Sequence, residues 1–348
     1  MKNNPNRKFI MNKPQLFPVV FVAGLLACLL AAPGFAGDLG TEVSGKGRTG
    51  TPAAETSSSG CPQNADGTFC WMNPDIGEAW ASGYTGSGVS VTVVDRFTGD
   101  EQQIGDLGHG PRWRLHGQWV AQMAGMVAPG ANIIELDNSE ADSLLLEDGL
   151  NVINLSYAIE EPLSGYPLEE PYLLEESIVD AARAGAAVFT KAAGNDSVAV
   201  GTPDVEGRID FLATDLIGMQ STIFVGALEH NGTPENKAGL AAYSNYAGSN
   251  PEVQNQFLTV GVESDRTGLY GTSLAAPVVA GYAAILGSKF TSATPTQLGN
   301  QLLDTARTDT IVNYNAATYG RGEASLSRAL APFRSGRRAL RFEQLNFL

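Results

Sequence analysis

Three polar residues stand where the sequence could place reactive side chains. Asp95 ends the apolar segment 89–94, His116 opens a segment with apolar residues at helical spacing, and Ser273 precedes a run rich in Ala, Val and Gly. A hydroxyl, an imidazole and a carboxylate are the groups that nucleophilic catalysis combines. Taken alone, however, Asp95 is more often a turn or cap residue, and Ser273 is more often a simple helix N-cap.

The surrounding segments predict an α/β fold, a three-layer sandwich with a mainly parallel central sheet. Strand-like apolar runs alternate with helical stretches, among them 117–127, 173–184 and the run after Ser273. Strands spaced by helices indicate βαβ units and a sheet that is covered on both faces. Ligands of such sheets bind at the carboxyl ends of the strands, which is where Asp95 is expected. The predicted strands are 89–94, 131–136, 152–155, 186–192 and 223–227.

The chain has only three histidines, so few residues could serve as a base. His116 would begin a helix with its ring free, because apolar residues follow it at helical spacing. His109 lies between two glycines without a helix behind it, and His230 lies in a polar turn. Ser273 would lie at a helix N-terminus, where backbone N–H groups favour negative charge. Pro277 falls so close to this helix start that we expect a distorted first turn and not a broken helix.

Composition and charge favour a compact α/β enzyme. The chain has 348 residues, of which 43% are hydrophobic and 17% are charged, and it contains 40 glycines. This is enough apolar material for one large domain or two small ones, and it does not suit a disordered chain. The formal net charge of −15 argues against nucleic acid as a partner, because sequence-independent binding to the phosphate backbone requires positive charge.

Residues 1–36 are predicted to be a signal peptide, so we expect an exported protein, either secreted or periplasmic. Basic residues precede an apolar run at 17–32, and 34–36 resembles a small-residue cleavage site. Two alternatives stay open. The apolar run is nearly long enough to act as a membrane anchor, and 25–28 resembles a lipobox that would make Cys28 a lipidated N-terminus. Once the signal is removed, no stable membrane span is expected.

The rest of the chain is predicted to hold one domain, at 73–333, followed by a basic tail at 334–348. Residues 37–72 are predicted to be a flexible linker, because 37–60 is rich in Gly, Thr, Ser and Ala. With an export signal present, Cys61 and Cys70 are expected to form a disulfide, and two unpaired cysteines are the alternative. By loop entropy such a small ring contributes roughly 2–3 kcal/mol.

Taken together, these segments resemble the subtilisin-like serine peptidases over about residues 73–332. The order Asp, His, Ser is the order of the catalytic residues in that family. The segment 271–277, Gly-Thr-Ser-Leu-Ala-Ala-Pro, matches the highly specific nucleophile motif. The histidine motif begins at His116, and 192–195 matches the oxyanion-asparagine motif. The other matching segments are 127–131, 152–156, 319–322 and 328–330.

The resemblance implies a serine-type endopeptidase that acts on protein or peptide substrates. Asp95, His116 and Ser273 would form the catalytic triad, and Asn195 with the Ser273 backbone N–H would bind the oxyanion. Such a mechanism requires no cofactor. Relatives often bind structural calcium, but no Asp-rich loop in this sequence allows ligands to be assigned. The physiological substrate and the oligomeric state stay open.

Three features depart from the family pattern. After Asp95 the family usually continues with Ser-Gly or Thr-Gly, whereas 96–99 is Arg-Phe-Thr-Gly. After Ser156 the family often has a small residue and then Gly, whereas Tyr157 and Ala158 follow here, which would narrow the specificity pocket. Residues 37–72 are too polar and Gly-rich to form the folded pro-segment that many relatives carry.

Two alternative functions come from other classes. A catalytically impaired binding protein on the same fold would explain the altered segment after Asp95. An esterase or lipase would favour Gly-x-Ser-x-Gly with the histidine last in the chain, a pattern that the sequence does not contain. In the peptidase, the six glutamates of 159–176 would favour basic peptides if some of them lie at the rim of the pocket, and otherwise they form a solvated acidic surface.

Overall fold

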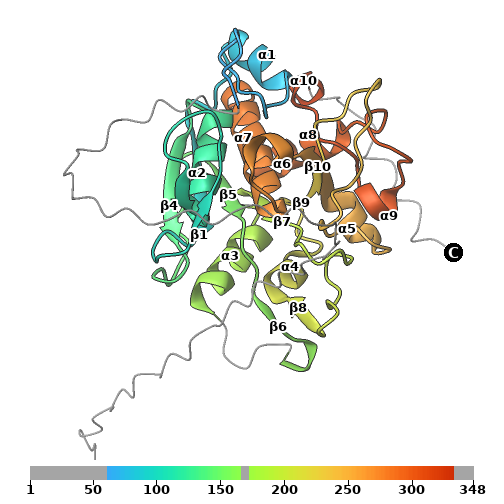
Figure 1. Ribbon diagram of the computed structural model, residues 1–348. Coiled ribbons are helices and arrows are strands. Elements are labelled where there is room, and N and C mark those ends of the chain that lie inside the picture. The colour runs from blue at the N-terminus through green and yellow to red at the C-terminus, as the bar shows by residue number, and fades with distance from the viewer. Residues whose placement is uncertain (1–60, 166–171, 333–348) are drawn as a thin grey trace, which may run out of the picture. The chain divides into compact units, whose positions relative to one another are not determined.

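The computed structural model describes residues 61–165 and 172–332, which form an α/β domain (Figure 1). Its centre is a six-stranded sheet with the strand order β10-β9-β7-β5-β1-β4, in which all neighbouring strands are parallel. Parallel strands that are covered on both faces have near-continuous apolar runs, and every residue of β1, β9 and β10 is buried. The strands are β1 Val89–Asp95, β4 Asn132–Asp137, β5 Leu150–Leu155, β7 Val188–Ala192, β9 Thr222–Leu228 and β10 Phe257–Gly261.

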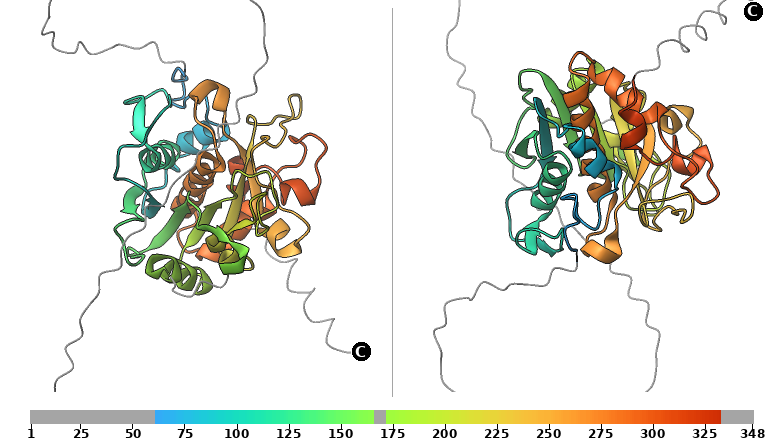
Figure 2. Two further views of the ribbon diagram at one scale, coloured as in Figure 1. Left: turned by 60° about the horizontal axis from the view of Figure 1, so that its bottom comes forward. Right: turned by 90° about the horizontal axis from the view of Figure 1, so that it is seen from above.

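Helices cover both faces of the sheet, as two further views show (Figure 2). Successive side chains of a strand point to opposite faces, so Val152 of β5 joins the core on one side and Ile153 joins the core on the other. The first face carries α2 His116–Val127, α7 Thr272–Lys289 and α8 Pro295–Asp304, and the second carries α3 Leu173–Arg183 and α4 Phe211–Leu216. The predicted fold, a three-layer sandwich around a parallel sheet, is confirmed.

Helix α7 is buried along almost its whole length, where it packs against the sheet and beside α2. A Cβ at Gly281 would lie 2.4 Å from Cγ1 of Val127 on α2, so the absence of a side chain there allows the two helices to pack this closely. Pro277 lies inside α7, which continues without a break to Lys289. The prediction that Pro277 would not break this helix is confirmed.

The five predicted strands all lie in the central sheet, with ends shifted by no more than two residues. The sequence did not predict the edge strand β10, which directly follows the short helix α5. It also did not predict two short antiparallel pairs, β2 with β3 and β6 with β8. These shorter elements are β2 Gln102–Ile104, β3 Trp113–Leu115, β6 Glu160–Pro162, β8 Arg208–Asp210, the 3-10 helix Leu163–Gly165, α1 Asp75–Ala81, α5 Pro251–Gln256, α6 Ser264–Thr267, α9 Ala316–Tyr319 and α10 Leu326–Ala329.

The segment 61–72 packs against the domain, whereas the sequence predicts that it belongs to a flexible linker at 37–72. Cys61 and Cys70 form the expected disulfide, with their Cα atoms 5.2 Å apart. Trp71 and Met72 are buried in the core, and Nε1 of Trp71 donates to the carbonyl of Leu107 at 3.2 Å. The burial of these apolar side chains stabilises the contact of the segment with the domain. The predicted domain boundary at residue 73 was therefore placed too late in the chain.

Other parts of the predicted organisation lie outside the described residues. These are the signal peptide at 1–36 with Cys28, the linker at 37–60 and the tail at 334–348. Within 61–165 and 172–332, none of the helices combines the length and the apolar character that crossing a membrane requires.

Candidate active site

The side chains of Asp95 and His116 meet at the carboxyl end of β1. Nδ1 of His116 lies 2.8 Å from Oδ1 and 3.0 Å from Oδ2 of Asp95. Asp95 is the last residue of β1 and is buried, whereas His116 is the first residue of α2 and keeps 27% of its side chain exposed. With a carboxylate at Nδ1, Nε2 is the ring nitrogen that can accept a proton from another group.

Gly117 allows the end of β1 to approach the start of α2. Its backbone N–H donates to the carbonyl of Arg96 at 3.3 Å. A Cβ at Gly117 would lie 2.7 Å from that carbonyl oxygen and 3.0 Å from Cβ of Asp95. Any other residue after His116 would therefore push apart the two elements that carry the pair.

A second carboxylate, Asp137 at the end of β4, holds the unusual segment that follows Asp95. Oδ2 of Asp137 accepts from the backbone N–H of Phe97 at 3.0 Å and from the hydroxyl of Thr98 at 2.9 Å. Partial burial raises the pKa of Asp137, but the hydrogen bonds that it accepts outweigh this effect and leave the pKa lowered. Asp137 thus holds the loop as an ionised group, and Asp95 is the carboxylate that contacts the histidine.

Ser273 lies in the first turn of α7 and is buried. Pro277 has no N–H, so the carbonyl of Ser273 lacks its usual helical donor. The hydroxyl of Ser156, which follows β5, donates to that carbonyl at 2.8 Å instead. Ser156 accepts in turn from Nδ2 of Asn154 at 2.8 Å, and Oδ1 of Asn154 accepts from the hydroxyl of Thr190 at 3.2 Å. A buried chain of hydrogen bonds therefore ties β5 and β7 to the start of α7.

Asn195 follows β7 and faces the same helix start. Its Oδ1 accepts from the backbone N–H of Thr272 at 2.8 Å, which leaves its Nδ2 group as the donor for another partner. A Cβ at Gly271 would lie 2.9 Å from Oγ of Ser273 and 3.5 Å from Nδ2 of Asn195. These two polar atoms therefore border one space, which is kept open by a glycine with a φ of +117°.

The structure brings the four predicted residues together as two pairs, His116 with Asp95 and Ser273 with Asn195. The strands β1, β5 and β7 are parallel neighbours, so the residues that follow them lie at one edge of the sheet. Helices α2 and α7 also pack against each other. Within the described ranges the Ser273 hydroxyl forms no hydrogen bond to His116; such contacts often tighten only when substrate binds.

The other two histidines have different surroundings. His109 is exposed, and its backbone carbonyl accepts from Nε2 of Gln122 at 2.7 Å. Nδ1 of His230 lies 3.0 Å from the carbonyl oxygen of Asn231. Among the histidines of the described chain, His116 is thus the one that is paired with a carboxylate.

A pocket opens beside Asn195. It is lined by Gly194 and Asp196, the two chain neighbours of Asn195, and by Ala158 beyond β5. The hydroxyl of Tyr157 donates to Glu175 on α3 at 2.8 Å. Burial, and then the negative charge of Glu175, raise the pKa of Tyr157, so this hydroxyl keeps its proton. Of the two residues that depart from the family pattern, Ala158 is therefore the one at the pocket.

Of the charged residues of this pocket, the sequence singled out Glu160, as one of the six glutamates of 159–176, but not the other four. These residues lie in polar segments between β5 and α4 that have no apolar periodicity. No sequence signal therefore indicated where their side chains point. Likewise, nothing in the sequence indicated that the hydroxyl of Ser156 would bind the carbonyl of Ser273. The charged lining residues are Glu160, Asp196, Asp204, Arg208 and Asp210.

Calcium ligands cannot be assigned to this domain. In residues 61–165 and 172–332, no group of three or more His, Cys, Asp or Glu side chains is arranged to hold a metal ion.

Solved structures are similar to this chain. The prenylagaramide maturation protease PagA is similar over 74% of this chain and 97% of its own, with 20% sequence identity and a TM-score of 0.50. MycP1 from Mycobacterium smegmatis is similar over 75% of this chain and 86% of its own, with 21% sequence identity and a TM-score of 0.48. No curated protein sequence matches the chain.

The amino-acid sequence also matches a family model. The model of the subtilase family matches residues 105–323, which is more than half of the chain. The match includes His116, Asn195 and Ser273, and it begins after Asp95, whose following segment departs from the family pattern. The parallel sheet and its covering helices agree with this match. The chain therefore belongs to the subtilase family of serine peptidases.

Proposed function

We propose that this chain is an exported serine endopeptidase in which Asp95, His116 and Ser273 form the catalytic triad. The observation that carries the proposal is the contact of His116 with Asp95, 2.8 Å, at the sheet edge that Ser273 and Asn195 share. A serine beside a histidine that a buried carboxylate orients is the arrangement that activates a hydroxyl as a nucleophile.

In the first step, Oγ of Ser273 attacks the carbonyl carbon of the peptide bond while Nε2 of His116 takes the hydroxyl proton. Asp95 bonds to Nδ1, so it fixes the required tautomer and stabilises the imidazolium that forms. His116 then gives this proton to the leaving amine, and an ester on Ser273 remains. Water attacks that ester with His116 again as the base, which releases the acid and restores the serine.

Asn195 and the Ser273 backbone N–H are the proposed donors to the oxyanion. The N–H of Thr272 holds Oδ1 of Asn195 at 2.8 Å, so Nδ2 borders the space beside Oγ of Ser273. Donors that are positioned before the reaction stabilise charge that develops on the carbonyl oxygen only in the transition state. The N-terminus of α7 adds a favourable partial positive charge.

Export is supported by the disulfide between Cys61 and Cys70, because disulfides persist mainly in oxidising compartments. The basic and apolar segments of residues 1–36 have the pattern of a secretory signal. Protein or peptide substrates follow from membership of the family.

The test is to treat the purified full chain with a serine-directed fluorophosphonate and to locate the adduct by mass spectrometry. We expect modification of Ser273, loss of labelling in Ser273→Ala and His116→Ala, and normal labelling in Ser87→Ala, which removes an exposed hydroxyl elsewhere. Cleavage of a quenched peptide that is blocked at both ends should follow the same pattern. Peptide binding without any adduct or cleavage would favour a binding protein on this fold.

A further inference from the structure

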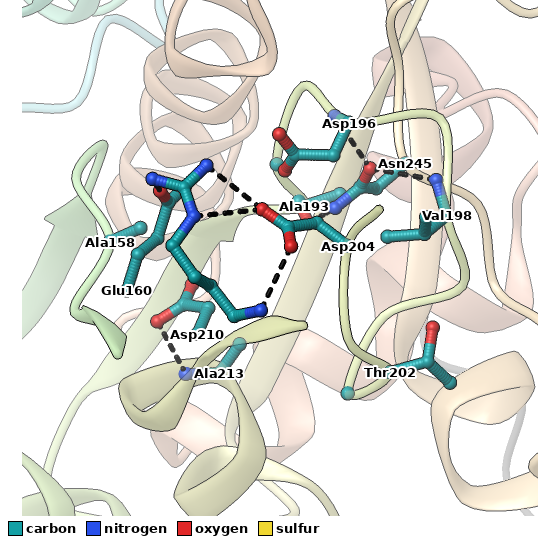
Figure 3. Close-up of a pocket in the computed structure, with 13 residues that line it drawn as sticks. Ala158, Glu160, Ala193, Asp196, Val198, Thr202, Asp204, Asp210, Ala213 and Asn245 are labelled. Carbon is teal, nitrogen blue, oxygen red and sulfur yellow. Dashed lines mark hydrogen bonds and ion pairs between the residues drawn. The ribbon is translucent and has the colours of Figure 1, made fainter. Parts of the chain in front are cut away.

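The pocket beside Asn195 indicates the class of substrate. We propose that it binds the side chain of a Lys or Arg residue that contributes the scissile carbonyl, with Asp196 and Glu160 as ionic partners (Figure 3). This inference rests on the proposed function, because it requires Ser273 to attack a carbonyl beside Asn195.

The pocket lies within reach of the reacting carbonyl. Gly194 and Asp196 line it and flank Asn195, whose Nδ2 shares a space with Oγ of Ser273. Ala158, which follows the neighbouring parallel strand β5, also lines it. A substrate side chain stems from the carbon next to the carbonyl, so a carbonyl held between Ser273 and Asn195 presents its own side chain to this opening.

The pocket carries more negative than positive groups. Arg208 is the one cation among its lining residues. A second cation, Lys191, pairs with one of the lining carboxylates, because its side chain is 1% exposed and its Nζ lies 2.7 Å from Oδ2 of Asp210. Even with both cations present, the excess of carboxylates attracts a positively charged side chain. The lining carboxylates are Glu160, Asp196, Asp204 and Asp210.

Two of these carboxylates already have structural partners. Oδ2 of Asp204 lies 3.0 Å from Nε and 2.9 Å from Nη2 of Arg208, and its Oδ1 accepts from the backbone N–H of Arg208 at 2.8 Å. Asp210 pairs with Lys191, and its Oδ1 accepts from the N–H of Ala213 at the start of α4. These two carboxylates stabilise the lining of the pocket, and their negative charge is already balanced by Arg208 and Lys191.

Asp196 and Glu160 are the two that remain. Asp196 is exposed and forms no ion pair with any residue that the structure describes. Glu160 makes one contact to a cation, 3.3 Å from Nη1 of Arg208. Partial burial of the carboxyl group is the largest cause that raises the pKa of each, and neighbouring carboxylates raise it further, which outweighs the lowering by Arg208. A substrate ammonium or guanidinium group would give Asp196 an ionic partner and would place a second cation beside Glu160.

The opposite specificity, for an acidic side chain bound by Arg208, is disfavoured. The guanidinium of Arg208 already contacts Asp204, Glu206 at 3.2 Å and Glu160 at 3.3 Å. An incoming carboxylate would have to displace one of these partners and would then face the unpaired charge of Asp196.

The experiment measures kcat/KM of the full chain on quenched peptides that differ only in the residue before the cleaved bond: Lys, Arg, Gln, norleucine or Glu. We expect Lys and Arg to be preferred over norleucine by about tenfold or more. Asp196→Asn and Glu160→Gln should each lower the Lys-to-norleucine ratio several-fold, and Asp196→Lys should shift the preference toward Glu. Because each ratio is taken within one variant, a general loss of activity cancels.

The control is Asp309→Asn, which removes the same charge from an exposed pair with Arg328 outside the pocket lining and should keep the wild-type ratio. Cleavage that depends on Ser273 but shows no preference for Lys or Arg overturns the proposal and leaves the proposed function intact. A wild-type preference for Glu overturns it as well. No cleavage of any peptide, with no fluorophosphonate adduct on Ser273, refutes the proposed function and this inference with it.

Discussion

The hydroxyl of Ser156 donates a hydrogen bond of 2.8 Å to the backbone carbonyl of Ser273. In a regular helix this carbonyl would accept from the N–H four residues later, and in α7 that position is Pro277. Both Ser156 and Ser273 are buried, so a carbonyl without a donor would be costly. A residue from the end of β5 therefore replaces the helical bond that the proline removes, next to the proposed nucleophile.

Removing the Ser156 hydroxyl should therefore destabilise the protein. We expect Ser156→Ala to lower the free energy of unfolding by about 1–3 kcal/mol, because the carbonyl of Ser273 then lacks a donor. Pro277→Ala supplies an N–H that can reach this carbonyl, so the loss should be smaller in the double variant. Urea unfolding of the wild type, the two single variants and the double variant gives the coupling energy. Losses that simply add would contradict the link.

Gly271→Ala should block the proposed site. The new Cβ would lie 2.9 Å from Oγ of Ser273 and 3.5 Å from Nδ2 of Asn195, in the space where the substrate carbonyl must bind. We expect kcat/KM to fall by about 10²-fold or more, because the reacting groups can no longer be brought together. The comparison variant is Gly268→Ala, since Gly268 also has a positive φ, +69°, but open space around it. Equal losses in both variants would point to backbone strain as the cause.

The positions of Asp95 and His116 could be predicted because both depend on local patterns. A continuous apolar run ends at Asp95, and the spacing of apolar residues after His116 places it at a helix start. A parallel sheet then aligns the carboxyl ends of its strands, which brings Asn195 to the same edge. Chain order and periodicity are sufficient to place these three residues at one edge of the sheet, whereas their expected roles came from the resemblance to the subtilisin-like peptidases.

The rest of the site depends on contacts between distant segments. Ser156 reaches Ser273 across 117 residues of sequence, and no local pattern records that contact. Asp204 and Arg208 shape the pocket from a polar segment, where periodicity gives no direction for a side chain. Of the glutamates in 159–176 that suggested a basic preference, Glu160 lines the pocket, whereas Glu175 bonds to Tyr157.

Asn195→Asp separates the proposed catalytic role of Asn195 from a structural one. An aspartate keeps an oxygen that can accept from the N–H of Thr272, a bond of 2.8 Å, but it loses the Nδ2 donor and adds negative charge. We expect kcat to fall by about 10²–10³-fold with little change in KM, because the lost interaction forms only in the transition state. Thermal unfolding should change little. A variant with normal kcat and a lowered Tm would show that Asn195 only holds the turn.

The preference for basic substrates should weaken as the solution is acidified. Burial, and then neighbouring carboxylates, raise the pKa of Glu160 above its usual 4.5 and that of Asp196 above its usual 3.8. A raised pKa means that each carboxyl group gains its proton at a higher pH, and the neutral acid no longer attracts a cation. Lysine stays charged and norleucine stays neutral throughout this pH range. The ratio of their kcat/KM values therefore reports the charge of the pocket carboxylates, because effects of pH on the catalytic groups act on both substrates and cancel. We expect this ratio to fall between about pH 7 and about pH 4.5, and to fall less in Asp196→Asn. A constant wild-type ratio over that range would mean that these carboxylates do not select the substrate.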